Sequence, residues 1–188
     1  MIESVNQVLN SSEPRITFRP LAVSDMTVML RWLSDPDVAP WYSGGGTSIE
    51  HLLNKYSPRI SGDDPTRGFI SQIEGIDVGY IQAYAIDSYH EYAVQMRIDP
   101  GAVGIDLFVG EAEYRGRGIG KAILKAFTET IVFGEMQAPF AVIAPDPKNL
   151  RAVRSYEKAE FTYLKTVFVE DKENPHNTGE EYLMVRYP

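Results

Sequence analysis

Apolar positions recur along this chain in two periods, which together predict an alternating series of strands and helices. Alternating or continuous β-branched and aromatic runs predict strands, and apolar spacings of three and four predict amphipathic helices. The predicted strands cover residues 15–20, 67–73, 78–86, 104–109, 140–143, 161–169 and 181–187, and the predicted helices begin near residues 24, 47, 119 and 149. Strands at both ends, with strand–helix–strand crossovers in the second half, predict a mixed α and β fold.

The segment from Gly104 to Lys121 stands out because a buried strand, a glycine-rich turn and a helix follow one another directly. The strand carries one carboxylate, Asp106, and the turn places three glycines within five positions, with an arginine on either side of the first. Free N–H groups at a helix N-terminus bind phosphate oxygens where no side chain blocks the approach, and arginines add charge-assisted hydrogen bonds. The turn lacks the Gly-Lys-Ser/Thr ending of a P-loop and the acidic residue of a dinucleotide fold. The pattern therefore predicts either another kind of phosphate loop or a tight turn that needs small residues.

Composition indicates one globular unit. The chain has 188 residues, of which 44% are hydrophobic, so we expect a single domain over residues 15–188 after a flexible tail over residues 1–14. The absence of cysteine excludes disulfides and thiolate chemistry, and it is consistent with a cytoplasmic location. No apolar run approaches the roughly 20 residues that span a bilayer, and the N-terminus lacks a signal-peptide pattern.

The charge balance is acidic, with 18 Lys and Arg residues against 26 Asp and Glu residues and a formal net charge of −8. Nucleic acids and anionic membranes bind basic surfaces, so neither is an expected partner. An acidic cleft concentrates cations, which favours a cationic substrate, although the same charge also serves solubility alone. His51 and His90 have no partners at metal-ligand spacing, so no metal site is expected.

The strand before the turn, the pattern Arg115-x-x-Gly118-x-Gly120, and a later helix with Asn149 and Tyr156 together resemble the GNAT acyltransferase superfamily. In that superfamily, the Arg/Gln-x-x-Gly-x-Gly/Ala element binds the pyrophosphate of acetyl-CoA. The chain is further similar to aminoglycoside 6′-N-acetyltransferases in Gly104-Ile105-Asp106, residues 150–161 and the Trp41-Tyr42-x-Gly-Gly loop. Siderophore-type N-acyltransferases share several of these features. The resemblance runs from about residue 15 to residue 187.

The resemblance implies an α+β fold of three layers, in which helices flank a central, mostly antiparallel sheet that splays in the middle. Acetyl-CoA would lie in the gap, with backbone N–H groups near Phe108 and Val109 polarising the thioester carbonyl. Asn149 would contact the pantetheine or simply cap its helix. The pyrophosphate would be bound by backbone amides of Arg115, Gly116, Arg117, Gly118, Ile119, Gly120 and Lys121.

Two residues carry the chemistry that the resemblance implies. Asp106 would orient the acceptor amine and can act as its base, and it interrupts an apolar strand where an unpaired carboxylate is costly. The alternative is a structural carboxylate bonded to a neighbouring N–H. Tyr156 would protonate or hydrogen-bond the CoA sulfur, and the alternative is an ordinary core aromatic on an amphipathic helix.

The acceptor side is less defined. Trp41 and Tyr42 would form a wall for a sugar ring or else pack in the core. The segment 87–101 is polar and irregular, as substrate loops tend to be. Asp106 is a candidate ammonium contact. Further candidates, for which a solvated surface carboxylate is the commoner interpretation, are Glu91, Asp99 and Glu181.

Two positions depart from the family pattern. Ala144 stands where aminoglycoside enzymes carry a substrate-binding Asp, and Asp146 could substitute only if its loop shifts. Glu160 replaces the glycine of a Lys-Ala-Gly-Phe helix ending. A positive φ there would strain the backbone.

These observations favour an acetyl-CoA-dependent N-acetyltransferase that uses no metal and acts on a polycationic amine, in particular an aminoglycoside 6′-amine, as a monomer or homodimer. Transfer would be direct, within a ternary complex. One alternative is a GNAT acyltransferase for a siderophore hydroxylysine, polyamine or peptide amine. Another is a CoA-binding sensor with little turnover.

Overall fold

The computed structural model describes residues 14–42, 48–170 and 178–188. Within these residues seven strands form one sheet in the order β1-β2-β3-β4-β5-β7-β6, and every neighbouring pair is antiparallel except β4 and β5. The strands are β1 (Ile16–Pro20), β2 (Arg67–Ile73), β3 (Ile76–Ala85), β4 (Val103–Val109), β5 (Ala141–Ile143), β6 (Thr162–Val169) and β7 (Gly179–Arg186).

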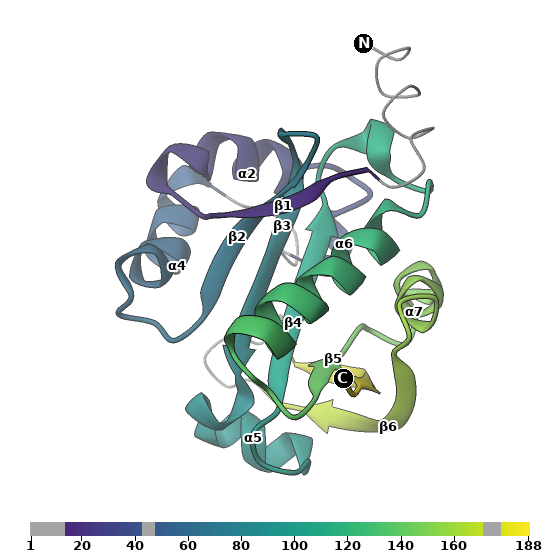
Figure 1. The fold of residues 1–188 in the computed structure, drawn as a ribbon. Coiled ribbons are helices and arrows are strands. Elements are labelled where there is room, and N and C mark those ends of the chain that lie inside the picture. The colour runs from purple at the N-terminus through teal and green to yellow at the C-terminus, as the bar shows by residue number, and fades with distance from the viewer. Residues whose placement is uncertain (1–13, 43–47, 171–177) are drawn as a thin grey trace.

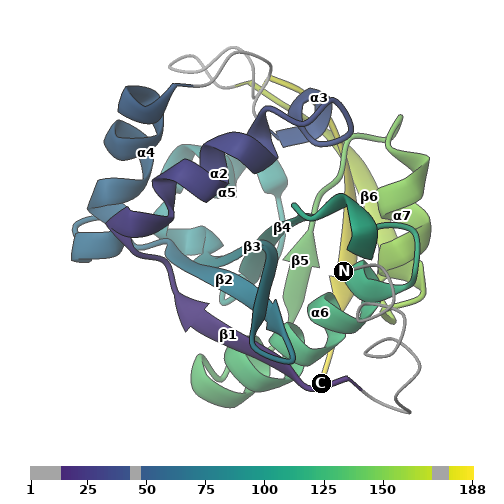
Figure 2. The ribbon, with the colours of Figure 1, turned by 90° about the horizontal axis from the view of Figure 1, so that it is seen from above.

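Helices cover both faces of this sheet, and Figures 1 and 2 show the three layers. α6 crosses one face with α7 beside it, α2 and α4 lie on the opposite face, and α5 packs near the β5–β7–β6 end. The helices are α2 (Met26–Leu33), α3 (Ala39–Tyr42), α4 (Ile49–Ser61), α5 (His90–Met96), α6 (Ile119–Phe127) and α7 (Leu150–Glu157). Short 3-10 turns span Val23–Asp25, Ile86–Ser88 and Ala112–Tyr114, and a π-helical segment, Thr128–Glu135, continues α6.

The sheet divides the core because side chains alternate along each strand. On β3, Ile81 and Ala83 pack under α6, whereas Tyr80 points to the face covered by α2 and α4. Phe108 of β4 lies directly opposite Tyr80, so it shares that second face. Residues with the same parity as Phe108 and Tyr80 therefore line the α2–α4 side of the sheet.

The sheet splits between β4 and β5. The parallel pairing of these two strands is confined to Val103 with Ala141 and Gly104 with Val142. β5 ends at Ile143, whereas β4 continues to Val109 without a partner on that side. The mostly antiparallel, splayed sheet between helices confirms the predicted fold class.

The element predictions from the sequence hold with two exceptions. Residues 87–101 were expected to be irregular, but His90–Met96 forms α5, because Met96 and Tyr92 can bury apolar surface against β7. Trp41 and Tyr42 were expected in a loop but lie in the short helix α3. Residues 1–13 of the predicted tail 1–14 and the glycines at 44–46 lie outside the described residues. No helix in the described part of the chain has the length and apolarity needed to cross a membrane.

Candidate active site

Asp106 lies on β4 directly opposite Gln82 of β3, on the α2–α4 side of the sheet. Gln82 Nε2 donates a hydrogen bond of 2.7 Å to Asp106 Oδ2. Gln82 is almost fully buried, while Asp106 keeps part of its surface accessible beside the split in the sheet. The carboxylate is therefore held from one side and accessible from another.

A second layer of polar groups holds Gln82 in turn. Arg59 of α4 donates from Nη1 to Gln82 Oε1 at 2.7 Å, and the hydroxyl of Tyr80 donates to the same oxygen at 2.8 Å. Arg59 also stacks over the Tyr56 ring, with 5.3 Å from its guanidinium carbon to the ring centroid. Three elements, α4, β3 and β4, thus meet in one hydrogen-bonded chain that ends at Asp106.

The protonation of Asp106 reflects two opposing effects. Burial raises the pKa of Asp106 above its usual value, because desolvation disfavours the charged form. The hydrogen bond from Gln82 and the positive charges of Arg59 and Lys55 lower its pKa and offset part of that rise. A carboxylate with a raised pKa is a better proton acceptor than an exposed one, which suits a general base.

Gly104 makes room for an aromatic side chain next to Asp106. Tyr84 faces Gly104 across the β3–β4 ladder, and a Cβ on Gly104 would lie 2.6 Å from the Tyr84 ring. Any larger residue would displace that ring. The Tyr84 side chain also lowers the pKa of the Asp106 carboxyl group. The Gly-Ile-Asp sequence therefore builds the wall of the site as well as its carboxylate.

The glycine-rich turn places an open helix N-terminus at the end of the split. Gly116 and Gly118 have φ values of 74° and 82°, which L side chains rarely adopt, and no atom lies within 4 Å of a Cβ built on either. Gly118 is the N-cap of α6, so the first N–H groups of that helix have no carbonyl partner within it. The free N–H groups at this end of α6 can donate hydrogen bonds to phosphate oxygens.

Arg115 does not point its charge at that opening. Its side chain is only 8% exposed and donates to the Val109 carbonyl at 2.9 Å, to the Gly110 carbonyl at 2.6 Å and to Asp35 at 2.8 Å. Its backbone N–H donates to the carbonyl of Ala112. Arg115 was predicted to bind the pyrophosphate, but these contacts give it the task of tying the turn to the end of β4.

The free edge of β4 offers one of the two predicted N–H groups. Gly110 N–H donates to Val78 across the β3 ladder at 2.8 Å, and peptide groups of alternate residues face the same edge. The peptide group of Phe108 therefore faces β3, and the Phe108 carbonyl oxygen lies 2.2 Å from where a Cβ on Gly79 would stand. The prediction for Phe108 is wrong for this reason, whereas the N–H of Val109 faces the split.

Tyr156 and Asn149 lie on the other side of the split. Tyr156 is half-buried on α7, and its pKa is raised, first by burial and then by the charge of Asp106. The charge of Asp106 thus acts on the Tyr156 hydroxyl. Asn149 accepts from the Ala152 N–H at 3.1 Å, so its side chain caps α7, in agreement with the capping alternative.

Glu181 is the acceptor-side carboxylate that the fold brings inward. It lies on β7 and accepts from the hydroxyl of Tyr92 on α5 at 2.9 Å. Burial raises the pKa of Glu181 to about 7, the Tyr92 hydrogen bond lowers it, and the charge of Asp106 adds to the rise. Glu181 and Asp106 thus influence each other across the same space.

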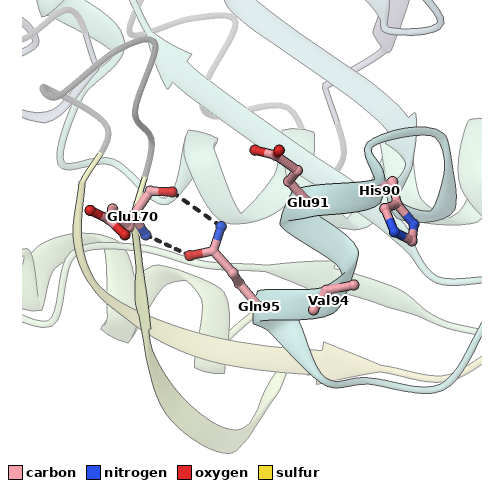
Figure 3. A pocket seen from close by; sticks show the side chains of 5 residues that line it. All are labelled: His90, Glu91, Val94, Gln95 and Glu170. Atoms are coloured by element: carbon pink, nitrogen blue, oxygen red, sulfur yellow. Dashed lines mark hydrogen bonds between the residues drawn. The ribbon is translucent and has the colours of Figure 1, made fainter.

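The other residues predicted to contact the acceptor differ in how far their side chains are buried. Tyr42 packs edge-on against Phe108 at 4.8 Å between ring centroids, whereas Trp41 is 47% exposed. Asp99 is exposed, and so is Glu91, which lines an open pocket on α5 with His90, Val94, Gln95 and Glu170 (Figure 3). In that pocket Gln95 exchanges two hydrogen bonds with the backbone of Glu170.

Asp146 does not take the place of the acid that the family pattern predicts at Ala144. Ala144 is half-buried just after β5 and packs with the apolar residues around α5. Asp146 is exposed, and its carboxylate accepts from the Lys148 N–H at 2.7 Å. Asp146 therefore stabilises its own turn.

Sequence reasoning missed several residues around Asp106, although one signal was present. Tyr80, Gln82 and Tyr84 alternate within residues 78–85, which are otherwise small and apolar, and alternation places all three on one face. Lys55 and Arg59 are four apart on α4, so they share a helix face toward the same site. Among the described residues, no group of three His, Asp or Glu side chains could hold a metal ion.

The chain is similar to known acetyltransferases in sequence and in fold. A family model described as an acetyltransferase (GNAT) domain matches residues 22–169. The aminoglycoside N(6′)-acetyltransferase type 1 of Klebsiella pneumoniae is 26% identical over 166 residues, which cover 87% of this chain and 82% of that protein. A kanamycin resistance protein of Rhizobium radiobacter is 38% identical over 73 residues, covering 39% of this chain and 67% of that protein.

Solved structures of acetyltransferases are also similar to this chain. The aminoglycoside acetyltransferase AAC(6′)-Ib in complex with coenzyme A and kanamycin superposes with a TM-score of 0.80 at 26% identity, covering 92% of this chain and 95% of that one. The spermidine N-acetyltransferase of Vibrio cholerae has a TM-score of 0.69 at 15% identity, over 92% and 95% of the two chains, and shares the fold alone.

Proposed function

This chain belongs to the GNAT acetyltransferase family, and from that premise we propose that it transfers the acetyl group of acetyl-CoA to the 6′-amine of aminoglycosides. The observation that carries this proposal is the position of Asp106. This carboxylate lies beside the split of the sheet with a raised pKa, while the open N-terminus of α6 lies at the end of the same split. An acetyl donor in the split and an amine at Asp106 would then meet.

The chain would supply several contacts for the acetyl donor, which brings the thioester that the amine attacks. The first N–H groups of α6, after Gly116 and Gly118, would bind its pyrophosphate. The N–H of Val109 would donate to the thioester oxygen, where negative charge develops during attack. Arg117 and Lys121 would add positive charge at the loop. Asn149 would contribute to binding of the acetyl donor through its cap of α7.

Proton transfer completes the reaction. Asp106 would accept a proton from the acceptor ammonium, and the freed nitrogen forms a bond to the acetyl carbon while the carbon–sulfur bond breaks. Tyr156 would donate its hydroxyl proton to the departing sulfur, and the second proton that the acylated nitrogen releases would return Tyr156 to its neutral form. Its raised pKa keeps it protonated until that moment. No covalent enzyme intermediate is required.

The acceptor class is supported by the relatives and by two inward acids. The K. pneumoniae and R. radiobacter relatives are named for aminoglycoside and kanamycin chemistry. Asp106 and Glu181 would bind two ammonium groups of a polycation, with Trp41 and Tyr42 beside the sugar rings. We also propose a cytoplasmic location, where acetyl-CoA is made available.

A second acceptor class is favoured by a specific feature. Lys55 and Arg59 place two positive charges near Asp106, and Ala144 leaves the expected acidic contact missing. An amine that carries its own carboxylate, such as a hydroxylysine, would suit these cations better than a polycation would.

Thiol release from acetyl-CoA, measured across an amine panel, tests the proposal. The panel sets kanamycin, tobramycin and a 6′-hydroxyl aminoglycoside against spermidine, N-hydroxylysine and a lysine peptide. Release with the 6′-amino drugs alone supports the proposed acceptor and regiochemistry. Release only with N-hydroxylysine would replace it with the second class, and tight acetyl-CoA binding with no release would indicate a sensor.

The role of Asp106 has its own test. Asp106→Asn keeps the shape of the side chain but removes the base, so we expect kcat to fall by at least about 10²-fold with unchanged acetyl-CoA affinity. Asp63→Asn, in the exposed turn after α4, is the matched control. An Asp106→Asn enzyme as active as the control would remove this carboxylate from the mechanism.

A further inference from the structure

We propose that Arg59 is a positioning residue that acts through Gln82 to hold Asp106 oriented and ionised toward the acceptor amine. The inference rests on the proposed role of Asp106 in the transfer reaction. It assigns a task to a largely buried arginine that reaches Asp106 through Gln82.

The direction of the hydrogen bonds along this chain follows from chemistry alone. A guanidinium can only donate, so the atom of Gln82 that faces Arg59 Nη1 at 2.7 Å must be the amide oxygen. The Tyr80 hydroxyl donates to the same oxygen at 2.8 Å. The amide nitrogen of Gln82 therefore faces Asp106, and the contact of 2.7 Å requires Asp106 Oδ2 to accept. Arg59 thus fixes Gln82 in the one orientation that favours an unprotonated Oδ2.

The surroundings of Arg59 leave its charge available for this purpose. The side chain is only 15% exposed, and its hydrogen-bond partner is the neutral Gln82. The nearest carboxylate oxygen, on Asp64, is 4.0 Å from Arg59 Nε and already accepts from Tyr89 and Thr66. Arg59 Nε itself is buried without a hydrogen-bond partner. Burying a charge is costly when no carboxylate is bonded to it, so a compensating function is expected.

Other groups face Asp106 from each element packed against it, and they define what Arg59 adds. Lys55 is a second cation from α4, and Glu181 of β7 is an opposing acid. Besides burial, the charge of Asp106 also raises the pKa of neighbouring neutral tyrosine hydroxyls, which are those of Tyr42, Tyr56, Tyr80, Tyr84, Tyr92 and Tyr156. Among the described residues, Arg59 is the cation that donates to Gln82, so it acts on Asp106 through a fixed hydrogen-bonded bridge.

The acid limb of the pH profile of kcat/KM, measured with saturating acetyl-CoA, distinguishes this role from a structural one. Removing the charge in Arg59→Met should move that limb upward by roughly one pH unit, because ionised Asp106 loses stabilisation. Activity should recover as the pH rises above the shifted limb. The ionisation of the acceptor is the same in every variant, so a difference between limbs reports the enzyme. Arg59→Lys keeps the charge and should retain most of the wild-type profile.

Two further variants complete the design. Arg67→Met removes an arginine that also stacks on an aromatic ring, that of Phe69, but bonds to Glu135 away from the site, and its profile should match wild type. Gln82→Leu cuts the bridge while leaving Arg59 in place, and it should shift the limb in the same direction. In the Gln82→Leu background, adding Arg59→Met should have a much smaller effect than in wild type.

The outcomes separate cleanly. An unshifted limb in Arg59→Met, or a loss of activity equal at every pH, would overturn the proposal. An Arg59→Met shift of the same size with and without Gln82 would replace the bridge with a through-space field. Should Arg59→Met fail to fold, the limbs of Arg59→Lys and Gln82→Leu decide in the same way. Full activity of Asp106→Asn would remove the proposed mechanism itself, whereas an inactive Asp106→Asn with a normal Arg59→Met would remove only the inference about Arg59.

Discussion

Replacing Arg115 with methionine should destabilise the fold and, as a consequence, weaken acetyl-CoA binding. Its guanidinium joins three parts of the chain: the end of β4 through the carbonyls of Val109 and Gly110, the segment after α2 through Asp35, and the glycine-rich turn that it begins. Methionine fills a similar volume but leaves both carbonyls without that donor. The turn should then lose its anchor at the base of the split.

The magnitude follows from these contacts. Two charge-assisted hydrogen bonds to carbonyls contribute about 1.5 kcal/mol each, and the pair with partly exposed Asp35 adds up to about 1 kcal/mol. Removing the desolvation cost of the guanidinium offsets part of this sum. We expect a net loss of about 2–3 kcal/mol in the free energy of unfolding, which for a chain of this size lowers Tm by about 5–10 °C.

The assay combines chemical denaturation with calorimetric titration of acetyl-CoA. Arg115 lowers the pKa of Asp35, so this carboxylate stabilises the folded state above its unfolded pKa of about 4, and the contribution is lost as the pH falls through the lower folded value. The difference in unfolding free energy between wild type and Arg115→Met should therefore shrink below about pH 4. Arg117→Met is the comparison, because Arg117 is exposed beside the same turn.

The two arginine variants should differ in their effects on stability and on acetyl-CoA affinity. Arg115→Met should lose stability with a moderate loss of affinity, whereas Arg117→Met should lose acetyl-CoA affinity with little change in Tm. The reasoning would be refuted by an Arg115→Met protein of wild-type stability that binds acetyl-CoA poorly, since that result describes a direct phosphate contact.

Two further predictions concern the cofactor and acceptor sides. Gly118→Val should weaken acetyl-CoA binding by calorimetry, whereas Gly62→Val, at a similar φ of 87° with equally open surroundings at the end of α4, should not; equal affinities would contradict the phosphate-loop assignment. Glu181 has a pKa of about 7, so it is mainly protonated at pH 6 and ionised at pH 8, and the KM for a polycationic acceptor should fall between these values in wild type. Glu181→Gln should lose that part of the pH dependence, and an unchanged dependence would exclude Glu181 as an ammonium contact.

Glu160 illustrates how far a family pattern reaches. The sequence predicted strain if this position required a positive φ, and its φ is 72°. What the sequence could not give is the compensation: its carboxylate accepts from Lys125 at 2.7 Å and from Arg186 at 3.0 Å, residues distant along the chain. Local backbone needs follow from local sequence, whereas ion-pair partners depend on the packing of elements.

The sequence by itself determined the order of the elements and the position of the glycine-rich turn, because periodicity and glycine placement are local properties. Its resemblance to the GNAT superfamily implied the splayed α+β class. Only the tertiary structure decided the partners of each side chain. It turned Arg115 inward, directed the Phe108 peptide group to β3 and brought Arg59 to Asp106 through Gln82. Strand register and helix packing join residues far apart in sequence, and hydrogen-bond partners across such separations carry no signal in a single chain.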